Sequence, residues 1–142
     1  MNAAKLLPIL LIFLFLAGCG KEEKKPEIFS PDAYAFPMDN SWELDGSFRV
    51  KGLETKEREN KFEYKVTYSI TLTNDKNRNR IALKDVLYKE KADEELSDIG
   101  IDFQTELDST FTEGKYEALI NIKDNFSRKT AQLKFDIELS NN

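Results

Sequence analysis

The residue types on which enzymes most often rely are scarce in this chain of 142 residues. It has no histidine, so the side chain that most often serves as acid, base or zinc ligand near neutral pH is missing. Its only thiol is that of Cys19. No G-x-S-x-G, S-x-x-K or glycine-rich phosphate loop occurs, and carboxylates are so frequent that no pair stands out as a glycosidase acid and nucleophile. We therefore expect no enzymatic activity and no metal or dissociable cofactor.

Cys19 ends a short apolar segment at the N-terminus. Met1–Lys5 form a weakly basic start, Leu6–Leu16 is apolar, and small residues lead into the cysteine. The motif Leu16-Ala17-Gly18-Cys19 resembles the lipobox of bacterial lipoproteins. The resemblance implies that residues 1–18 are a signal peptide that is removed. It also implies a diacylglycerol on the sulfur of Cys19 and an acyl group on its new amino group, a combination that anchors a protein stably in a membrane.

A transmembrane helix and a signal peptide without a lipid both fit the apolar run less well. A transmembrane helix needs about 20 apolar residues, whereas charges begin here at Lys21. A signal peptide without a lipid would favour a small residue at the position of Leu16. We therefore expect a lipid-anchored protein of the bacterial cell envelope, placed in the outer membrane.

Residues 19–32 contain many charges and two prolines. We expect the lipidated cysteine and a flexible tether here, followed by one domain at 33–142. Lys21-Glu22-Glu23 resembles a surface-export signal of some Gram-negative lipoproteins, which implies display on the cell surface. The alternative is that lipoprotein tethers are generally rich in these residue types.

The charge balance bears on the class of partner. Without the signal peptide, which holds only Lys5, the chain has 20 basic and 26 acidic side chains. This balance argues against nucleic acid, which requires a clustered basic surface. It also argues against a polybasic grip on anionic lipid, so we expect the acyl chains alone to hold the membrane.

Apolar residues recur at every second position over most of the domain, which predicts strands with one buried face. The longest run spans 62–73, and at about 3.3 Å per residue it would be close to 40 Å long, enough to change partners midway. Its expected buried residues are Phe62, Tyr64, Val66, Tyr68, Ile70 and Leu72. Further strands are expected at 48–53, 81–88, 99–107, 116–122 and 131–139, with a first strand within 33–44 that Pro37 interrupts. Residues 91–98 are expected to form a solvated connection or a single helical turn.

About seven strands in some 110 residues predict an all-β sandwich. Glu113-Gly114-Lys115-Tyr116, followed by an alternating strand and a polar turn, resembles the final hairpin of immunoglobulin-like domains. The resemblance implies that the Tyr116 hydroxyl bonds back to upstream backbone as a tyrosine corner. The alternative is that Tyr116 is simply an inward aromatic residue. The cysteine pair of antibody domains is absent, so the fibronectin-III-like and bacterial immunoglobulin-like branches are the nearer relatives.

Two polar segments have some features of a cation site. Asp75–Arg80 has oxygen ligands at alternate positions, but it lacks the glycine and the glutamate of a calcium loop, which favours a polar hairpin turn. Asp93–Asp98 is the densest acidic patch. It is expected to be a solvated loop, with contact to a basic partner or to calcium left open.

The remaining candidates are contact residues for a partner. Leu119 interrupts the polar face of its strand, Phe126 lies in the last hairpin turn, and Phe111 lies in the loop before Tyr116. Trp42 is expected to fill the core. We therefore expect an envelope lipoprotein without catalytic activity, whose domain binds a protein or a glycan or serves as an accessory subunit. A membrane-anchored protease inhibitor of immunoglobulin-like fold is the alternative.

Overall fold

The computed structural model describes residues 20, 22–76 and 78–141, and this part of the chain forms strands and no helix. The strands are β1 (Glu27–Pro37), β2 (Trp42–Lys51), β3 (Lys56–Arg58), β4 (Lys61–Asn74), β5 (Asn79–Ala92), β6 (Asp98–Leu107), β7 (Gly114–Asp124) and β8 (Thr130–Leu139). The expected signal peptide and Cys19 lie outside the described residues.

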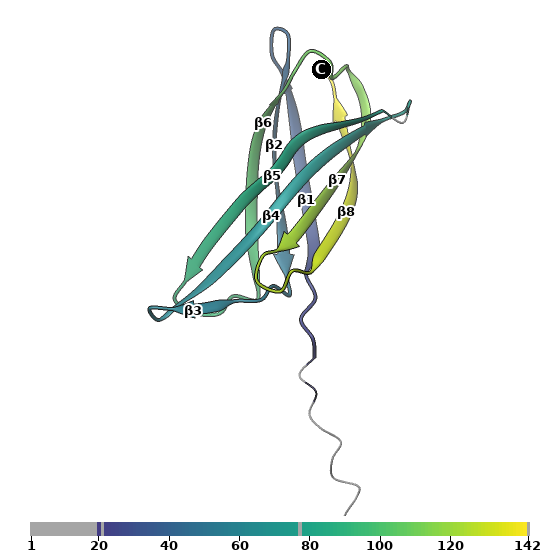
Figure 1. Ribbon diagram of the computed structural model, residues 1–142. Helices are drawn as coiled ribbons and strands as arrows, with labels where there is room; N and C mark the ends of the chain where they lie inside the picture. The colour runs from purple at the N-terminus through teal and green to yellow at the C-terminus, as the bar shows by residue number, and fades with distance from the viewer. Residues whose placement is uncertain (1–19, 21, 77, 142) are drawn as a thin grey trace, which may run out of the picture.

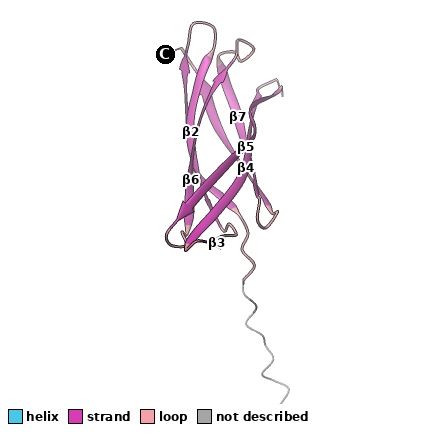
Figure 2. Cartoon of the chain, turned by 60° about the vertical axis from the view of Figure 1, so that its left-hand side comes forward, coloured by secondary structure: helices cyan, strands magenta, loops and turns pink. Residues whose placement is uncertain are grey.

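The strands form two antiparallel sheets that pack face to face (Figures 1 and 2). The first sheet has the order β1-β2-β6. The second has the order β3-β4-β7-β8, with β5 on the other edge of β4. In Figure 1, β4 and β5 run at an angle across the strands of the first sheet. This architecture confirms the expected all-β sandwich, with the short β3 added to the seven anticipated strands.

The alternating sequence of β4 explains how the core is built. Its inward residues, from Tyr64 to Leu72, are at most 4% exposed, and the polar residues between them lie on the outer face. Along one edge β4 pairs with β5, whereas along the other it pairs first with β3 and then, from Val66 onward, with β7. The strand therefore changes partners, as its length predicts. Phe62 is only partly buried, since the start of β4 extends sideways beyond β6 (Figure 1).

Aromatic residues join the two sheets in the middle of the core. Phe48 of β2 is fully buried, and its ring meets that of Tyr68 of β4 edge-on, with 5.5 Å between the centroids. Trp42 is 7% exposed, and its indole N–H donates to the carbonyl oxygen of Phe111 at 3.0 Å. Trp42 therefore fills the core, as expected. Burial of each such side chain stabilises the fold by about 1.5–3 kcal/mol.

Tyr116 forms the expected tyrosine corner at the start of β7. Its hydroxyl donates to the carbonyl oxygen of Thr112 at 2.8 Å and accepts the N–H of the same residue at 3.1 Å. The ring is buried, 4% exposed, beside that of Phe111. The hydroxyl therefore closes the loop that brings the chain from the first sheet into the second, as in immunoglobulin-like domains.

The structure corrects several expected boundaries. Ordered pairing begins at Glu27, within the segment expected to be tether, because Ile28 is apolar enough to enter the core and pairs with Val50. Pro37 ends β1 rather than interrupting a strand, and the chain turns there into β2. Residues 93–97 connect β5 to β6 without a helical turn.

Candidate functional site

The expected membrane anchor cannot be placed in the fold, because Cys19 lies outside the described residues. Within residues 20, 22–76 and 78–141 there is no helix long and apolar enough to cross a membrane. Lipidation of Cys19 and removal of residues 1–18 remain predictions.

The segment that leads into the sandwich is held against the domain. Lys129 Nζ lies 2.8 Å from a carboxylate oxygen of Glu23, and it donates to the carbonyl oxygen of Lys24 at the same distance. Lys24 Nζ in turn contacts the Glu95 carboxylate. Pro26 is buried. Each exposed ion pair contributes little, but together they fix the chain from Glu23 onward, so the tether is shorter than the sequence predicts.

The largest exposed apolar side chains of the first sheet lie together at the far end of β1. Tyr34 is 62% exposed and Phe36 49% exposed, both on the outer face, and Met38 follows in the turn to β2 at 54%. The sequence alone does not single these residues out, because the interrupting Pro37 obscures the alternation that places them on one face. Contiguous exposed apolar surface of this kind marks interaction sites.

Carboxylates surround these aromatic residues. Tyr34 pairs with Asp45, which pairs with Gln104, and Phe36 pairs with Glu43, which pairs with Glu106. Each of these pairings forms a row that crosses from β1 through β2 to β6, and a third such row contains Asp32, Ser47 and Asp102. The three rows thus have five carboxylates and no lysine or arginine. We call this surface, with Met38, the aromatic-acidic face.

One oxygen of the aromatic-acidic face has no partner. Oδ1 of Asp45 is shielded from solvent and accepts no hydrogen bond from any residue that the structure describes. Asp45 lines a shallow pocket of about 370 Å³ together with Tyr34 and Gln104. An unmet acceptor beside exposed aromatic rings favours a ligand that brings hydrogen-bond donors.

The three contact residues expected from the sequence have different surroundings. Phe111 is 7% exposed within the core, because its ring packs on Tyr116, so it offers no surface to a partner. Leu119 is half-buried on the outer face of the second sheet, in register with Thr71, which pairs with the exposed Ile81. Leu119 itself is therefore less accessible than Tyr34 and Phe36.

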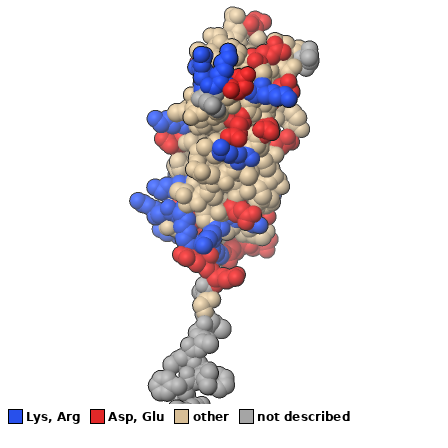
Figure 3. All heavy atoms as spheres, turned by 90° about the vertical axis from the view of Figure 1, so that its right-hand side faces the viewer, with Lys and Arg blue, Asp and Glu red and all other residues tan. Residues whose placement is uncertain are grey.

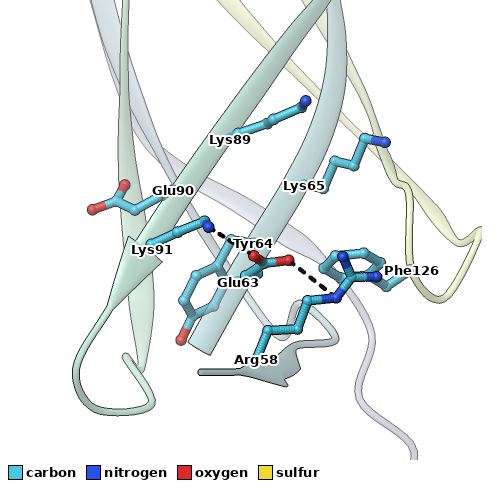
Figure 4. A pocket seen from close by; sticks show the side chains of 8 residues that line it. All are labelled: Arg58, Glu63, Tyr64, Lys65, Lys89, Glu90, Lys91 and Phe126. Atoms are coloured by element: carbon cyan, nitrogen blue, oxygen red, sulfur yellow. Dashed lines mark ion pairs between the residues drawn. The ribbon is translucent and has the colours of Figure 1, made fainter. Parts of the chain in front are cut away.

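Phe126, the third expected contact, lies at a pocket near the end of the domain where the tether enters. This basic pocket has a volume of about 300 Å³ and is formed by β3, β4, β5 and the β7–β8 turn (Figure 4). It is lined by Arg58, Glu63, Tyr64, Lys65, Lys89, Glu90, Lys91 and Phe126. Lys56 Nζ lies 4.8 Å from the centroid of the Phe126 ring, a cation–π distance.

The turn that carries Phe126 is built on a buried carboxylate. Asp124 is 1% exposed, and its Oδ1 accepts the N–H of Phe126 at 3.0 Å. Its Oδ2 accepts the N–H of Glu54 at 2.9 Å and the hydroxyl of Ser127 at 2.7 Å. These bonds join the β2–β3 connection to the β7–β8 turn and so position the ring of Phe126.

The acidic side chains of the described residues do not gather into a metal site. No three of their Asp, Glu, Cys or His side chains come together in a way that could hold a metal ion. The Glu63 carboxylate has its pKa lowered, chiefly by the hydrogen bond from Lys91, so it is a poor proton donor near neutral pH. The arrangement can bind charged groups: Glu63 forms ion pairs with Arg58 and Lys91, whereas Lys65 and Lys89 form none with the residues that the structure describes.

Comparisons with known proteins supply no family for this chain. No family model matches it, and no curated protein matches it at a significant level.

Proposed function

We propose that this protein is a non-catalytic lipoprotein of the bacterial outer membrane, anchored through Cys19, whose immunoglobulin-like domain binds a protein partner through the aromatic-acidic face. The observation that carries the proposal is the exposure of Tyr34 and Phe36 on the outer face of β1, with the exposed Met38 next to them in the turn to β2. Aromatic residues and methionine are enriched in protein interfaces. The five carboxylates favour a partner that presents lysine or arginine, which would also speed the encounter.

This face is a stronger candidate than the surface around Leu119. Tyr34 and Phe36 are larger and lie in adjacent outward positions of one strand, whereas Leu119 is half-buried between Thr71 and Lys134. The described residues supply no observation that favours the protease-inhibitor alternative.

Photo-crosslinking in intact membranes tests the binding surface. A photoreactive amino acid at position 36 should give a discrete adduct with one protein, whereas the same group at the exposed Gln132 of the second sheet should give none. A Phe36→Ser variant should lose most of the partner on affinity purification. The matched variant Ile81→Ser, which also removes an exposed apolar side chain (59% exposed), should keep it. Equal adducts at positions 36 and 132, or none at 36, would contradict the proposal.

The anchor is tested separately. Intact-mass measurement of the membrane-extracted protein should show a chain that begins at Cys19 and carries acyl groups. A Cys19→Ser variant should remain unprocessed. Detection of Met1 in the wild-type protein would overturn the anchor without affecting the binding surface. Fractionation of inner and outer membranes, followed by protease treatment of intact cells, tests the location.

A further inference from the structure

The basic pocket brings two lysines together on the face that also carries Glu63, whose pKa the charge of Lys89 helps to lower. Lys65 of β4 and Lys89 of β5 are directly opposite each other in the register of the second sheet. Neither forms an ion pair with any described residue. Like charges directly opposite on adjacent strands destabilise the pairing, and an anion bound between them would relieve this repulsion.

The other two cations of the pocket are held in place by one carboxylate. Glu63 lies 3.8 Å from Arg58 Nε and 3.0 Å from Lys91 Nζ. The Arg58–Glu63 distance is long, so the guanidinium keeps donors for a further acceptor. The second carboxylate of the lining, that of Glu90, accepts the hydroxyl of Tyr88 at 2.5 Å and points away from the other side chains (Figure 4). The pocket therefore has an excess of positive charge despite the acidic chain.

Basic side chains also gather on the surface near this end of the domain. In Figure 3, lysine and arginine side chains gather on one side of the lower part of the molecule, near the point where the tether leaves. The ring of Phe126 adds an apolar wall to the pocket, whereas Tyr64, which also lines it, is buried in the core (Figure 4). Its volume of about 300 Å³ is at the lower end of the range for small-molecule sites.

We propose that the basic pocket binds a phosphate group, with Lys65 and Lys89 as direct ligands and Arg58 as a further donor. A phosphate dianion neutralises both lysines at once, and its oxygens match the fork of the guanidinium. The phosphate belongs either to a free phosphorylated compound or to a lipid headgroup of the membrane to which the tether leads. This site lies on the second sheet and does not depend on the aromatic-acidic face.

Lysine footprinting on the protein extracted from membranes tests the site. Amine-labelling rates of Lys65 and Lys89 are read by mass spectrometry in neutral detergent, with inorganic phosphate or with chloride at equal ionic strength. A parallel arm uses vesicles of phosphatidylcholine alone or with phosphatidic acid. We expect the labelling rates of both lysines to fall at least about fivefold in at least one arm, either with inorganic phosphate or with vesicles that contain phosphatidic acid. Labelling of Lys84, an exposed lysine elsewhere on β5, should stay unchanged.

Variants complete the test. Lys89→Gln should abolish the protection of Lys65, whereas Lys84→Gln, with the same change of charge, should not. In the absence of phosphate, Lys89→Gln should unfold at the same temperature as wild type or higher, because it removes a repulsion. Protection by inorganic phosphate identifies a free ligand, and protection only by phosphatidic acid identifies a headgroup. Absence of protection in both arms, equal protection of Lys84, or protection of Lys65 that persists in Lys89→Gln would overturn the proposal. None of these outcomes bears on crosslinking at position 36.

Discussion

Asp124 is expected to be the most important polar side chain for stability, because it is the one charged residue that is buried among those the structure describes. Three donors converge on it: the N–H groups of Phe126 and Glu54 and the hydroxyl of Ser127. Hydrogen bonds to a charged acceptor contribute about 1.5–3 kcal/mol each, and leaving a buried donor unpaired costs about 1–3 kcal/mol.

The isosteric variant Asp124→Asn allows the magnitude to be worked out from these contacts. The new amide nitrogen is best placed at the Oδ1 position, where it faces only the N–H of Phe126. At the Oδ2 position it would face two donors. One backbone donor is therefore left unpaired, and two bonds lose the charge of their acceptor, while burial of a neutral amide offsets part of the loss. We expect Asp124→Asn to lower the free energy of unfolding by about 2–3 kcal/mol, and Asp124→Ala by about 3–5 kcal/mol.

Chemical unfolding of the protein, followed by circular dichroism, measures these differences. The control is Asp136→Asn on β8, which makes the same chemical change at an exposed position and should stay within about 0.5 kcal/mol of wild type. The reasoning is refuted if Asp124→Asn matches this control, or if the alanine variant is no less stable than the asparagine variant. Loss of Phe126 from its position should also reduce phosphate protection in the basic pocket.

Three further measurements test the fold. Tyr116→Phe should lower the free energy of unfolding by about 1–2 kcal/mol through the lost bonds to Thr112, whereas Tyr34→Phe at an exposed site should not. Gly46→Ala should cost about 1–3 kcal/mol, since a Cβ there would lie 2.6 Å from the carbonyl oxygen of Asp32. Burial, aided by the bond to Glu90, raises the pKa of Tyr88 from 10.0 to about 12. Between these values the unfolded chain releases a proton that the folded chain keeps, so the unfolding temperature should fall from pH 10 to 12, and less steeply in Tyr88→Phe.

The sequence predicted most of the strands because alternation is a local signal. Each strand that faces the core on one side and water on the other shows its period within a few residues, as β4 does from Tyr64 to Leu72. The tyrosine corner was expected from the resemblance of residues 113–116 to immunoglobulin-like domains, and its bond to Thr112 spans only four residues. The beginning of β1 was not, since the charges and prolines of 19–32 hide the single apolar residue, Ile28, that enters the core.

The candidate sites depend on register between distant segments, which one sequence does not reveal. Lys65 and Lys89 are separated by the whole β4–β5 hairpin, and their opposition depends on register shifts between Tyr68 and Thr71. The bond from Glu54 to Asp124 spans 70 residues. The net charge does not reveal this pocket either, because a chain with an acidic total can still hold a local excess of basic side chains. The expectations of no nucleic-acid partner and of no polybasic grip on anionic lipid stay predictions.

The position of the tether gives the two candidate sites different surroundings. Contacts with the domain begin at Glu23, so the connection from Cys19 spans at most about 14 Å when fully extended. The end of the domain that holds the basic pocket is thus within reach of headgroups if Cys19 carries a lipid. β1 runs away from this end, and its turn to β2, which contains Met38, lies at the opposite end of the sandwich (Figure 1). At about 3.3 Å per residue, Phe36 lies about 30 Å along β1 from Glu27. If Cys19 anchors the protein, a partner can therefore approach Phe36 without contacting the bilayer.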